Sequence, residues 1–233
     1  ASMIEGMDKS LGDLMNHLNK KGISDNTIIL FMSDNGGLSA HARGGEKHTH
    51  NKPLKSGKGS LYEGGIREPM IVKWPGKTKK ASITNKPVII EDFFSTVLEM
   101  AQINNYKTVQ NIDGISFTSL LKGEKEISND RSFFWHYPNN WGVNGPGIAA
   151  GSVIRKGDWK LIYYHLDSNF ELFNINKDIG EFKNLASSER DKLKELSKEL
   201  GNYLRKVNAQ MPVQTSTNTL VPWPDDKKIL NVY

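Results

Sequence analysis

Hydrophobic positions at the start of the chain predict an amphipathic helix followed by a strand. Apolar residues recur at helical spacing through residues 2–21, and Gly22 suits the C-cap of this helix. The apolar and β-branched run Thr27–Met32 (TIILFM) predicts a buried strand. Met70–Trp74 predicts a second strand, which the Pro75-Gly76 pair ends. A helix that leads into a strand is half of an α/β unit. The apolar positions of the helix are Met3, Met7, Leu11, Leu14 and Leu18.

A second amphipathic helix is predicted over about residues 91–102, after the segment Pro87–Ile90. Its expected apolar face carries Phe94, Val97, Leu98 and Ala101.

The pattern changes after about residue 128, where short strands follow one another. The predicted strands are Ser132–Tyr137, Ala150–Ile154, Trp159–Tyr164 and Phe170–Phe173. Gly157-Asp158 between two of them is typical of a hairpin turn. Successive strands joined by tight turns favour an antiparallel sheet.

A last helix is predicted over residues 187–207, with Ser187 or Ser188 as its N-cap. Its apolar stripe consists of Leu193, Leu196, Leu200, Leu204 and Val207. We therefore expect three regions: the later part of an α/β domain over 1–128, an antiparallel sheet with a helix over 129–211, and an extended tail over 212–233.

Composition fits a globular protein and excludes several functions. The chain has 233 residues, of which 37% are hydrophobic and 24% are charged. The net charge is +5, but most lysines are interspersed with acids, so we expect no nucleic-acid binding. Cysteine is absent, which excludes disulfides and thiolate sites within these residues. No apolar run reaches the length of a membrane span.

Asp34 and Asn35 directly follow the first predicted strand, where a carboxylate and an amide oxygen can bind Ca²⁺ or Mg²⁺. Ligands bind at this edge of open α/β sheets. The sequence Asp-Asn-Gly-Gly also suits a plain turn. Two oxygen ligands cannot complete a calcium site, so further carboxylates must come from elsewhere.

A glycine-rich loop carries Lys55 and Lys58 about twenty residues later. It is not a phosphate-binding Walker A loop, because Lys52 stands where the first glycine belongs and Gly59 follows Lys58. Its glycines allow close backbone approach, which could hold the Lys58 ammonium against a substrate oxygen. The alternative is a solvated lysine on a flexible loop.

Histidines and an Asn-Trp pair are candidates for substrate contact. His50 lies in a polar loop, and His136 lies in an aromatic strand, where a core histidine is the plain alternative. Asn140 precedes Trp141, and asparagine beside an exposed tryptophan can bind the face of a sugar. Simple packing of this pair remains the alternative.

These motifs together resemble the formylglycine-dependent sulfatases of the alkaline phosphatase-like superfamily. The resemblance runs along almost the whole chain, in the family's order. It is carried by DNTIILFMSDNGG, KSGKGSLYEGGIREPMIVKWPG, EDFFSTVLEMAQI, NIDGISFTSLL, DWKLIYY and FELFNINKDIGEFKNLA. The implied fold is the C-terminal part of an alkaline phosphatase-like sulfatase fold, of the α/β class, with a small antiparallel sheet plus helix subdomain.

The resemblance implies roles for particular residues. Asp34 and Asn35 would bind Ca²⁺, with Mg²⁺ the less expected ion, and Lys58 would contact the sulfate and the bridging ester oxygen. Glu63 and Arg67 would shape the loop rather than react. His136, His50 and Asn140 are our candidate contacts to a sulfated carbohydrate. Such sulfatases are often periplasmic or secreted, and we expect the same location here by analogy.

The chain departs from the family in one respect. The nucleophile would be a hydrated formylglycine made within a C/S-x-P-x-R motif, and none of the nine prolines has these neighbours. We therefore expect the nucleophile upstream of Ala1, a chain that corresponds to the C-terminal half of a sulfatase, and no turnover by this chain alone. Half of an α/β sheet would also leave an edge exposed for self-association.

Two alternatives remain open. A phosphate or phosphonate ester hydrolase of the same superfamily would use the same lysine and metal, although phosphatase relatives usually bring two metals. A non-catalytic carbohydrate-binding half-domain would need no nucleophile.

Overall fold

The computed structural model describes residues 2–39, 51–103, 105–124, 130–139, 144–215 and 217–233. No helix within these ranges is long and apolar enough to cross a membrane.

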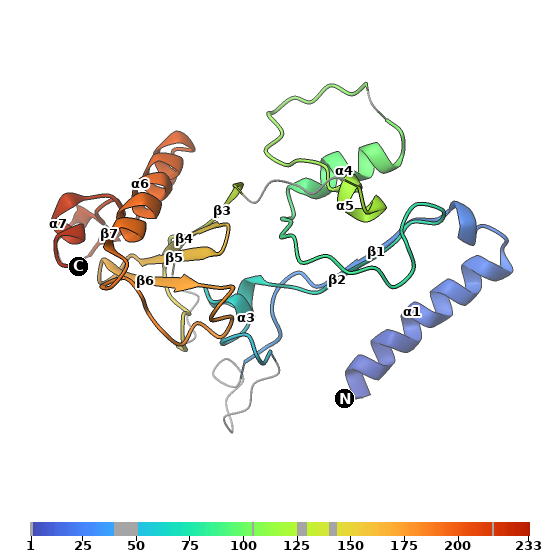
Figure 1. Cartoon of the computed structure of the whole chain (residues 1–233), viewed down its shortest axis with the longest axis horizontal. Coiled ribbons are helices and arrows are strands. Elements are labelled where there is room, and N and C mark those ends of the chain that lie inside the picture. Colours follow the sequence, from blue (N-terminus) through green and yellow to red (C-terminus); the bar gives the residue numbers. More distant parts are fainter. Residues whose placement is uncertain (1, 40–50, 104, 125–129, 140–143, 216) are drawn as a thin grey trace. The chain divides into compact units, whose positions relative to one another are not determined.

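The chain forms two compact units, each assembled from two stretches of sequence (Figure 1). The first contains Ala1–Met32 and Met70–Ser128. The second contains Ser33–Pro69 and Asn129–Tyr233. The segment with the metal and lysine motifs therefore belongs to the same unit as the small sheet.

The first unit begins with α1 (Ser2–Lys20) and continues through a short 3₁₀ turn, η1 (Ser24–Asn26), into β1 (Ile29–Met32). β1 pairs antiparallel with β2 (Met70–Lys73) in a two-stranded sheet. These elements were predicted, but the expected burial is wrong. α1 has no buried residue, and every residue of β1 is only partly buried. A two-stranded ribbon without a covering layer has no interior in which to bury its side chains.

Two further helices complete the first unit: α4 (Asp92–Met100) and α5 (Thr118–Lys122). The predicted apolar face of α4 is not its buried face, because Phe94 is 47% exposed while Asp92 and Thr96 are fully buried. The Asp92 carboxylate accepts hydrogen bonds from the backbone amides of Ile89, just before the helix, and Ile115, in the segment that leads to α5. The Thr96 hydroxyl accepts one from the Phe117 amide. The need to satisfy buried backbone groups thus outweighs side-chain hydropathy.

The second unit is built on a four-stranded antiparallel sheet, ordered β3-β4-β5-β6. The strands are β3 (Ser132–Tyr137), β4 (Gly151–Lys156), β5 (Trp159–Tyr164) and β6 (Asn169–Asn174). This confirms the predicted meander. Lys156 pairs with Trp159 across the predicted turn, in which Gly157 has a φ of 55°.

Alternating side chains give this sheet two buried faces. One face, with Ile154 and Leu161, packs against the leucines of α6 (Arg190–Lys206). The opposite face, with Val153 and Ile162, packs against Leu61 and Tyr62, which follow the glycine-rich loop. The sheet therefore supports the lysine motif directly.

The second unit differs from prediction at its helix start and in its tail. Ser188 does not cap α6, since Glu189 is the N-cap residue and makes no side-chain cap bond. The tail is not simply extended: it contains a short hairpin of β7 (Val213–Gln214) and β8 (Thr219–Leu220), and then α7 (Lys227–Leu230).

Candidate active site

The strand end directs oxygen atoms outward. The Ser33 hydroxyl donates to the Asn35 carbonyl over 2.8 Å, and the Asn35 side-chain amide nitrogen donates to the Gly36 carbonyl over 3.3 Å. The amide oxygen of Asn35 therefore remains as an acceptor. Asp34 is exposed, and within the described ranges its carboxylate has no hydrogen bond. These two side-chain oxygens are available for a ligand.

Two backbone hydrogen bonds join this strand end to the lysine loop. The Gly36 amide donates to the Gly65 carbonyl over 3.2 Å, and the Lys58 amide donates to the Gly37 carbonyl over 3.1 Å. Residues twenty or more positions apart are thus held backbone to backbone. The oxygen motif and Lys58, which the sequence only placed near each other along the chain, lie together in the fold.

Glycine is required for this approach. A Cβ atom on Gly36 would lie 1.8 Å from the Gly64 carbonyl oxygen, and one on Gly57 would lie 2.2 Å from the Gly37 carbonyl oxygen. Both distances are too short for any side chain. We call this backbone packing of residues 36–37 on residues 57–65 the glycine cradle.

The loop is also closed within itself. The Gly64 amide donates to the Lys55 carbonyl over 3.0 Å. The Asn51 side-chain amide donates to the carbonyl oxygens of Gly37 and Ser56, each over 2.9 Å. Ser56 has a φ of 63°, a left-handed conformation that is uncommon for residues other than glycine. The loop is therefore held in one specific shape.

The two loop lysines differ in what their ammonium groups contact. The Lys55 ammonium donates to the Glu181 carbonyl over 2.9 Å and lies 3.9 Å from the centre of the Tyr62 ring. Lys58 is partly buried, and within the part of the chain that the structure describes its ammonium has no partner. Lys55 therefore fixes the loop, whereas Lys58 is available to a substrate.

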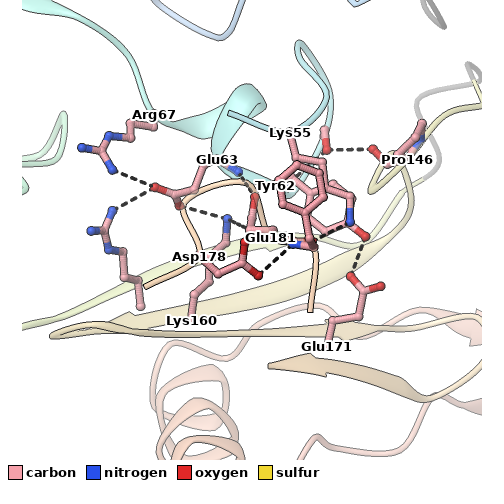
Figure 2. A network of polar contacts seen from close by, with 12 residues as sticks. Lys55, Tyr62, Glu63, Arg67, Pro146, Lys160, Glu171, Asp178 and Glu181 are labelled. Atoms are coloured by element: carbon pink, nitrogen blue, oxygen red, sulfur yellow. Dashed lines mark hydrogen bonds and ion pairs between the residues drawn. The ribbon is translucent and has the colours of Figure 1, made fainter. Parts of the chain in front are cut away.

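A buried ion cluster supports the short helix α3 (Glu63–Ile66), which follows the loop (Figure 2). The Glu63 carboxylate lies 3.0 Å from the Lys160 ammonium, 3.1 Å from the Arg155 guanidinium and 3.6 Å from that of Arg67. Burial alone would raise the pKa of Glu63, but the charges of Lys160 and Arg155 outweigh it and hold that pKa below its usual value.

Glu68 lies close enough to the oxygen motif to be affected by it. Its Oε1 atom is buried and has no hydrogen-bond partner among the described residues. Burial and the negative charge of Asp34 raise the pKa of Glu68 to about 7. A cation bound at Asp34 would reduce the repulsion between the carboxyl groups of Asp34 and Glu68.

These oxygens fit a hard divalent cation in type but not in number. Asp34 and Asn35 offer a carboxylate and an amide oxygen, the ligands that Ca²⁺ prefers, with Glu68 beside them. No group of three or more acidic, histidine or cysteine side chains suited to a metal occurs within the described ranges. A complete shell would therefore draw on further ligands.

His136 is held at both ring nitrogens. Its Nε2 atom lies 3.0 Å from the Gln210 carbonyl, which can only accept, so Nε2 carries the proton. Its Nδ1 atom lies 2.8 Å from the Ser152 hydroxyl, and that oxygen lies 2.9 Å from Nε2 of buried His165. Contact with a substrate would require His136 to exchange one of these partners, and that role stays a prediction. His50 and Asn140 lie outside the described residues.

Comparison with known proteins assigns the chain to a family. The family model described as "N-sulphoglucosamine sulphohydrolase, C-terminal" matches residues 56–210, and the one described as "Sulfatase" matches residues 1–103. The chain belongs to the sulfatase family. The family prediction, which rested on several ordered motifs, is thereby confirmed.

One curated relative of this sulfatase-family chain is a protein named "Sulfatase" from Formosa agariphila. It is 35% identical over 246 residues, which cover 96% of this chain and 42% of the relative. This chain therefore spans less than half the length of that relative.

Solved structures agree with the family assignment. A structure of Ps i-CgsB in complex with k-i-k-neocarrahexaose is 26% identical, with a TM-score of 0.70, and the match covers 97% of this chain and 44% of that one. BT4656 in complex with its substrate D-glucosamine-2-N,6-O-disulfate is 25% identical, with a TM-score of 0.65, and the match covers 88% and 38%. The predicted alkaline phosphatase-like α/β fold is confirmed.

The fold is shared more widely than the chemistry. A phosphonate monoester hydrolase from Silicibacter pomeroyi matches with a TM-score of 0.62 at 19% identity. At this identity the likeness shows the fold alone.

Proposed function

We propose that this chain forms part of a sulfuric ester hydrolase that removes sulfate from a sulfated carbohydrate. The observation that carries the proposal is the glycine cradle, in which the Lys58 amide is bonded to the Gly37 carbonyl over 3.1 Å. It holds the backbone of Lys58 against the segment that directly follows Asp34 and Asn35. A sulfate ester needs both kinds of group, because its anionic oxygens and its leaving oxygen both carry negative charge in the transition state.

In this proposal Lys58 donates a hydrogen bond to the oxygen that joins sulfur to the sugar. As the sulfur–oxygen bond breaks, the sulfuryl group would pass to a nucleophile supplied by the whole enzyme, the electron pair would stay on the sugar oxygen, and the ammonium would stabilise the developing alkoxide. Lys55 cannot take this role while its ammonium is bound to the Glu181 carbonyl.

Asp34 and Asn35 would hold Ca²⁺, which when bound would neutralise charge on the sulfate oxygens. The negative charge of Asp34 raises the pKa of Glu68, and a bound cation would reduce this repulsion between the two carboxyl groups. No C/S-x-P-x-R motif occurs in these 233 residues, so in this proposal the formylglycine nucleophile would have to be supplied by another part of the whole enzyme.

A sulfated carbohydrate is the proposed substrate class. One solved relative is described with the substrate D-glucosamine-2-N,6-O-disulfate, and another with k-i-k-neocarrahexaose. His136 is kept as a candidate contact, together with His50 and Asn140. We further propose a periplasmic or secreted location, as is common among such sulfatases.

A chimera tests the function, with this chain in place of the matching segment of the Formosa agariphila sulfatase. Matched sulfate and phosphate monoesters of one sugar would be assayed for release of the anion. We expect release of sulfate at a rate at least about tenfold above that of phosphate. Faster release of phosphate would overturn the proposal in favour of a phosphoryl ester hydrolase.

A further inference from the structure

A fully buried lysine stands in the middle of the small sheet. Lys160 of β5 has an exposed side-chain fraction of 0%, as do its two acidic partners. Its ammonium lies 3.0 Å from Oε1 of Glu63 and 2.8 Å from Oε1 of Glu181 (Figure 2). Burying a charge costs free energy unless it is paired, and an apolar residue here would avoid that cost. Stability alone therefore does not explain these buried charges.

The cluster also contacts the backbone at Glu63, just after the lysine loop. Oε2 of Glu181 accepts a hydrogen bond of 2.7 Å from the Glu63 amide, in the first turn of α3. Amides in a first turn have no partner within the helix, and the N-cap residue Tyr62 provides no side-chain cap. Glu181 therefore anchors this helix start from a segment 118 residues away in sequence.

Glu181 also contacts Lys55, at the start of the same loop. Its carbonyl accepts the Lys55 ammonium over 2.9 Å, and its φ of 52° lies in the left-handed region. The carboxylate and the carbonyl of one residue thus contact the loop on both sides of Lys58. Lys160 holds the carboxylate in place through the 2.8 Å ion pair. Release of Glu181 would free both ends of the loop together.

We propose that Lys160 and Glu181 are positioning residues for Lys58, an inference that rests on the proposed function of Lys58. Both side chains are fully buried, so neither is placed to contact a substrate. They fix the residues that bracket the loop, so that the hydrogen bonds from Gly64 to Lys55 and from Lys58 to Gly37 stay closed. The Lys58 ammonium then projects from a backbone that does not move during the reaction.

Amide hydrogen exchange on this chain tests the structural part. The variant is Lys160→Met with Glu181→Leu, since removing the lysine alone would leave the Glu181 carboxylate buried without a cation and could prevent folding. Leucine, unlike glutamine, offers no side-chain oxygen to the Glu63 amide. Glu63 keeps its ion pair with Arg155 at 3.1 Å. The control is Lys156→Met, which removes an ion pair of 2.8 Å from neighbouring strand β4.

We expect the Lys58 and Gly64 amides to exchange at least about tenfold faster in the double variant, while the amides of β5 keep their protection. The control should change neither the exchange of the Lys58 and Gly64 amides nor the protection of β5. Unchanged exchange at Lys58 and Gly64 in a folded double variant would overturn the inference.

Kinetics in the chimera described above test the functional part. The double variant should lower kcat by about tenfold or more and leave KM within about twofold, because the misplaced ammonium acts in the transition state. An unchanged kcat, in a chimera that Lys58→Met inactivates, would overturn the positioning role. Full activity of Lys58→Met would instead contradict the proposed function, and the exchange rates would still decide whether the cluster fixes the loop.

Discussion

The backbone amide of Lys58 donates a hydrogen bond to the carbonyl of Gly37 over 3.1 Å, and this contact joins the two motifs on which the proposed chemistry depends. One motif is a pair of oxygen ligands at a strand end, and the other is a cation on a glycine-rich loop. Neither is specific alone, since each resembles a common turn or a solvated loop. Their contact in the fold is what makes them a candidate site.

The glycine cradle predicts that Gly57→Ala destabilises the protein. The new methyl group would lie 2.2 Å from the Gly37 carbonyl oxygen, so the backbone must shift. We expect a loss of about 1–3 kcal/mol in the free energy of unfolding, measured by urea denaturation. The control is Gly12→Ala in α1, where the added methyl meets nothing within 4 Å and should stabilise the helix by up to about 1 kcal/mol. Equal stabilities for the two variants would show that the packing at Gly57 is not tight.

Calcium binding should depend on Asp34. Replacing it by asparagine removes one negative ligand and keeps the shape, so we expect a drop in calcium affinity of at least about tenfold. Isothermal titration of the chimera with calcium chloride measures it. Asp13→Asn is the matched control, because Asp13 is exposed on α1 and pairs with Lys9. An equal effect of both substitutions would indicate binding by net charge alone.

Stability should fall in mild acid because of His165. Burial, followed by the charge of nearby His136, lowers the pKa of His165 to about 4 from a usual 6.5. Between these values the unfolded chain binds a proton that the folded chain does not. Stability is therefore lost as pH falls from 6.5 towards 4, by about 2 kcal/mol at pH 5 relative to pH 7.

Thermal unfolding at both pH values tests this, with His165→Gln as the variant. Glutamine can still donate to Ser152 but does not titrate. The pH dependence of the variant should be smaller by about the same 2 kcal/mol. An identical pH dependence in the variant and the original chain would show that His165 is not the group responsible.

Self-association remains a prediction for the first unit. β1 and β2 form a two-stranded sheet, and Ile71 on β2 is 62% exposed. An unpaired edge with apolar side chains can pair with a second copy. We expect a dimer by light scattering, and Ile71→Lys should favour the monomer. A monomer at all concentrations in the original chain would rule out association through this edge.

The sequence predicted the three longer helices and the strands β1–β6, because their hydrophobic periods were clear, and it missed the short elements α3, α5, α7, β7 and β8. It failed where polar groups decide the packing. Asp92 and Thr96 are buried because they satisfy backbone amides, and no hydropathy pattern shows this. The predicted cap of α6 failed because several candidate residues stood side by side.

The sequence indicated the motifs of the candidate site, but it did not indicate the buried ion cluster that supports the loop. Asp34, Asn35 and Lys58 stood out because their residue types suit the chemistry. Lys160 was a visible anomaly, a charge inside the apolar strand WKLIYY, but its partner Glu63 is 97 residues away. Pairing over such a distance is set by the packing of the sheet, which a single sequence does not contain.

The most direct test of the account is the kcat for sulfate release by the chimera, compared between Lys58→Met and Lys52→Met. Lys52 is exposed in the same segment and serves as the matched control. If the Lys58 ammonium stabilises the leaving oxygen, Lys58→Met lowers kcat by about a hundredfold or more, while Lys52→Met leaves it within about twofold. A Lys58→Met chimera that retains the original kcat would contradict the proposed role of Lys58.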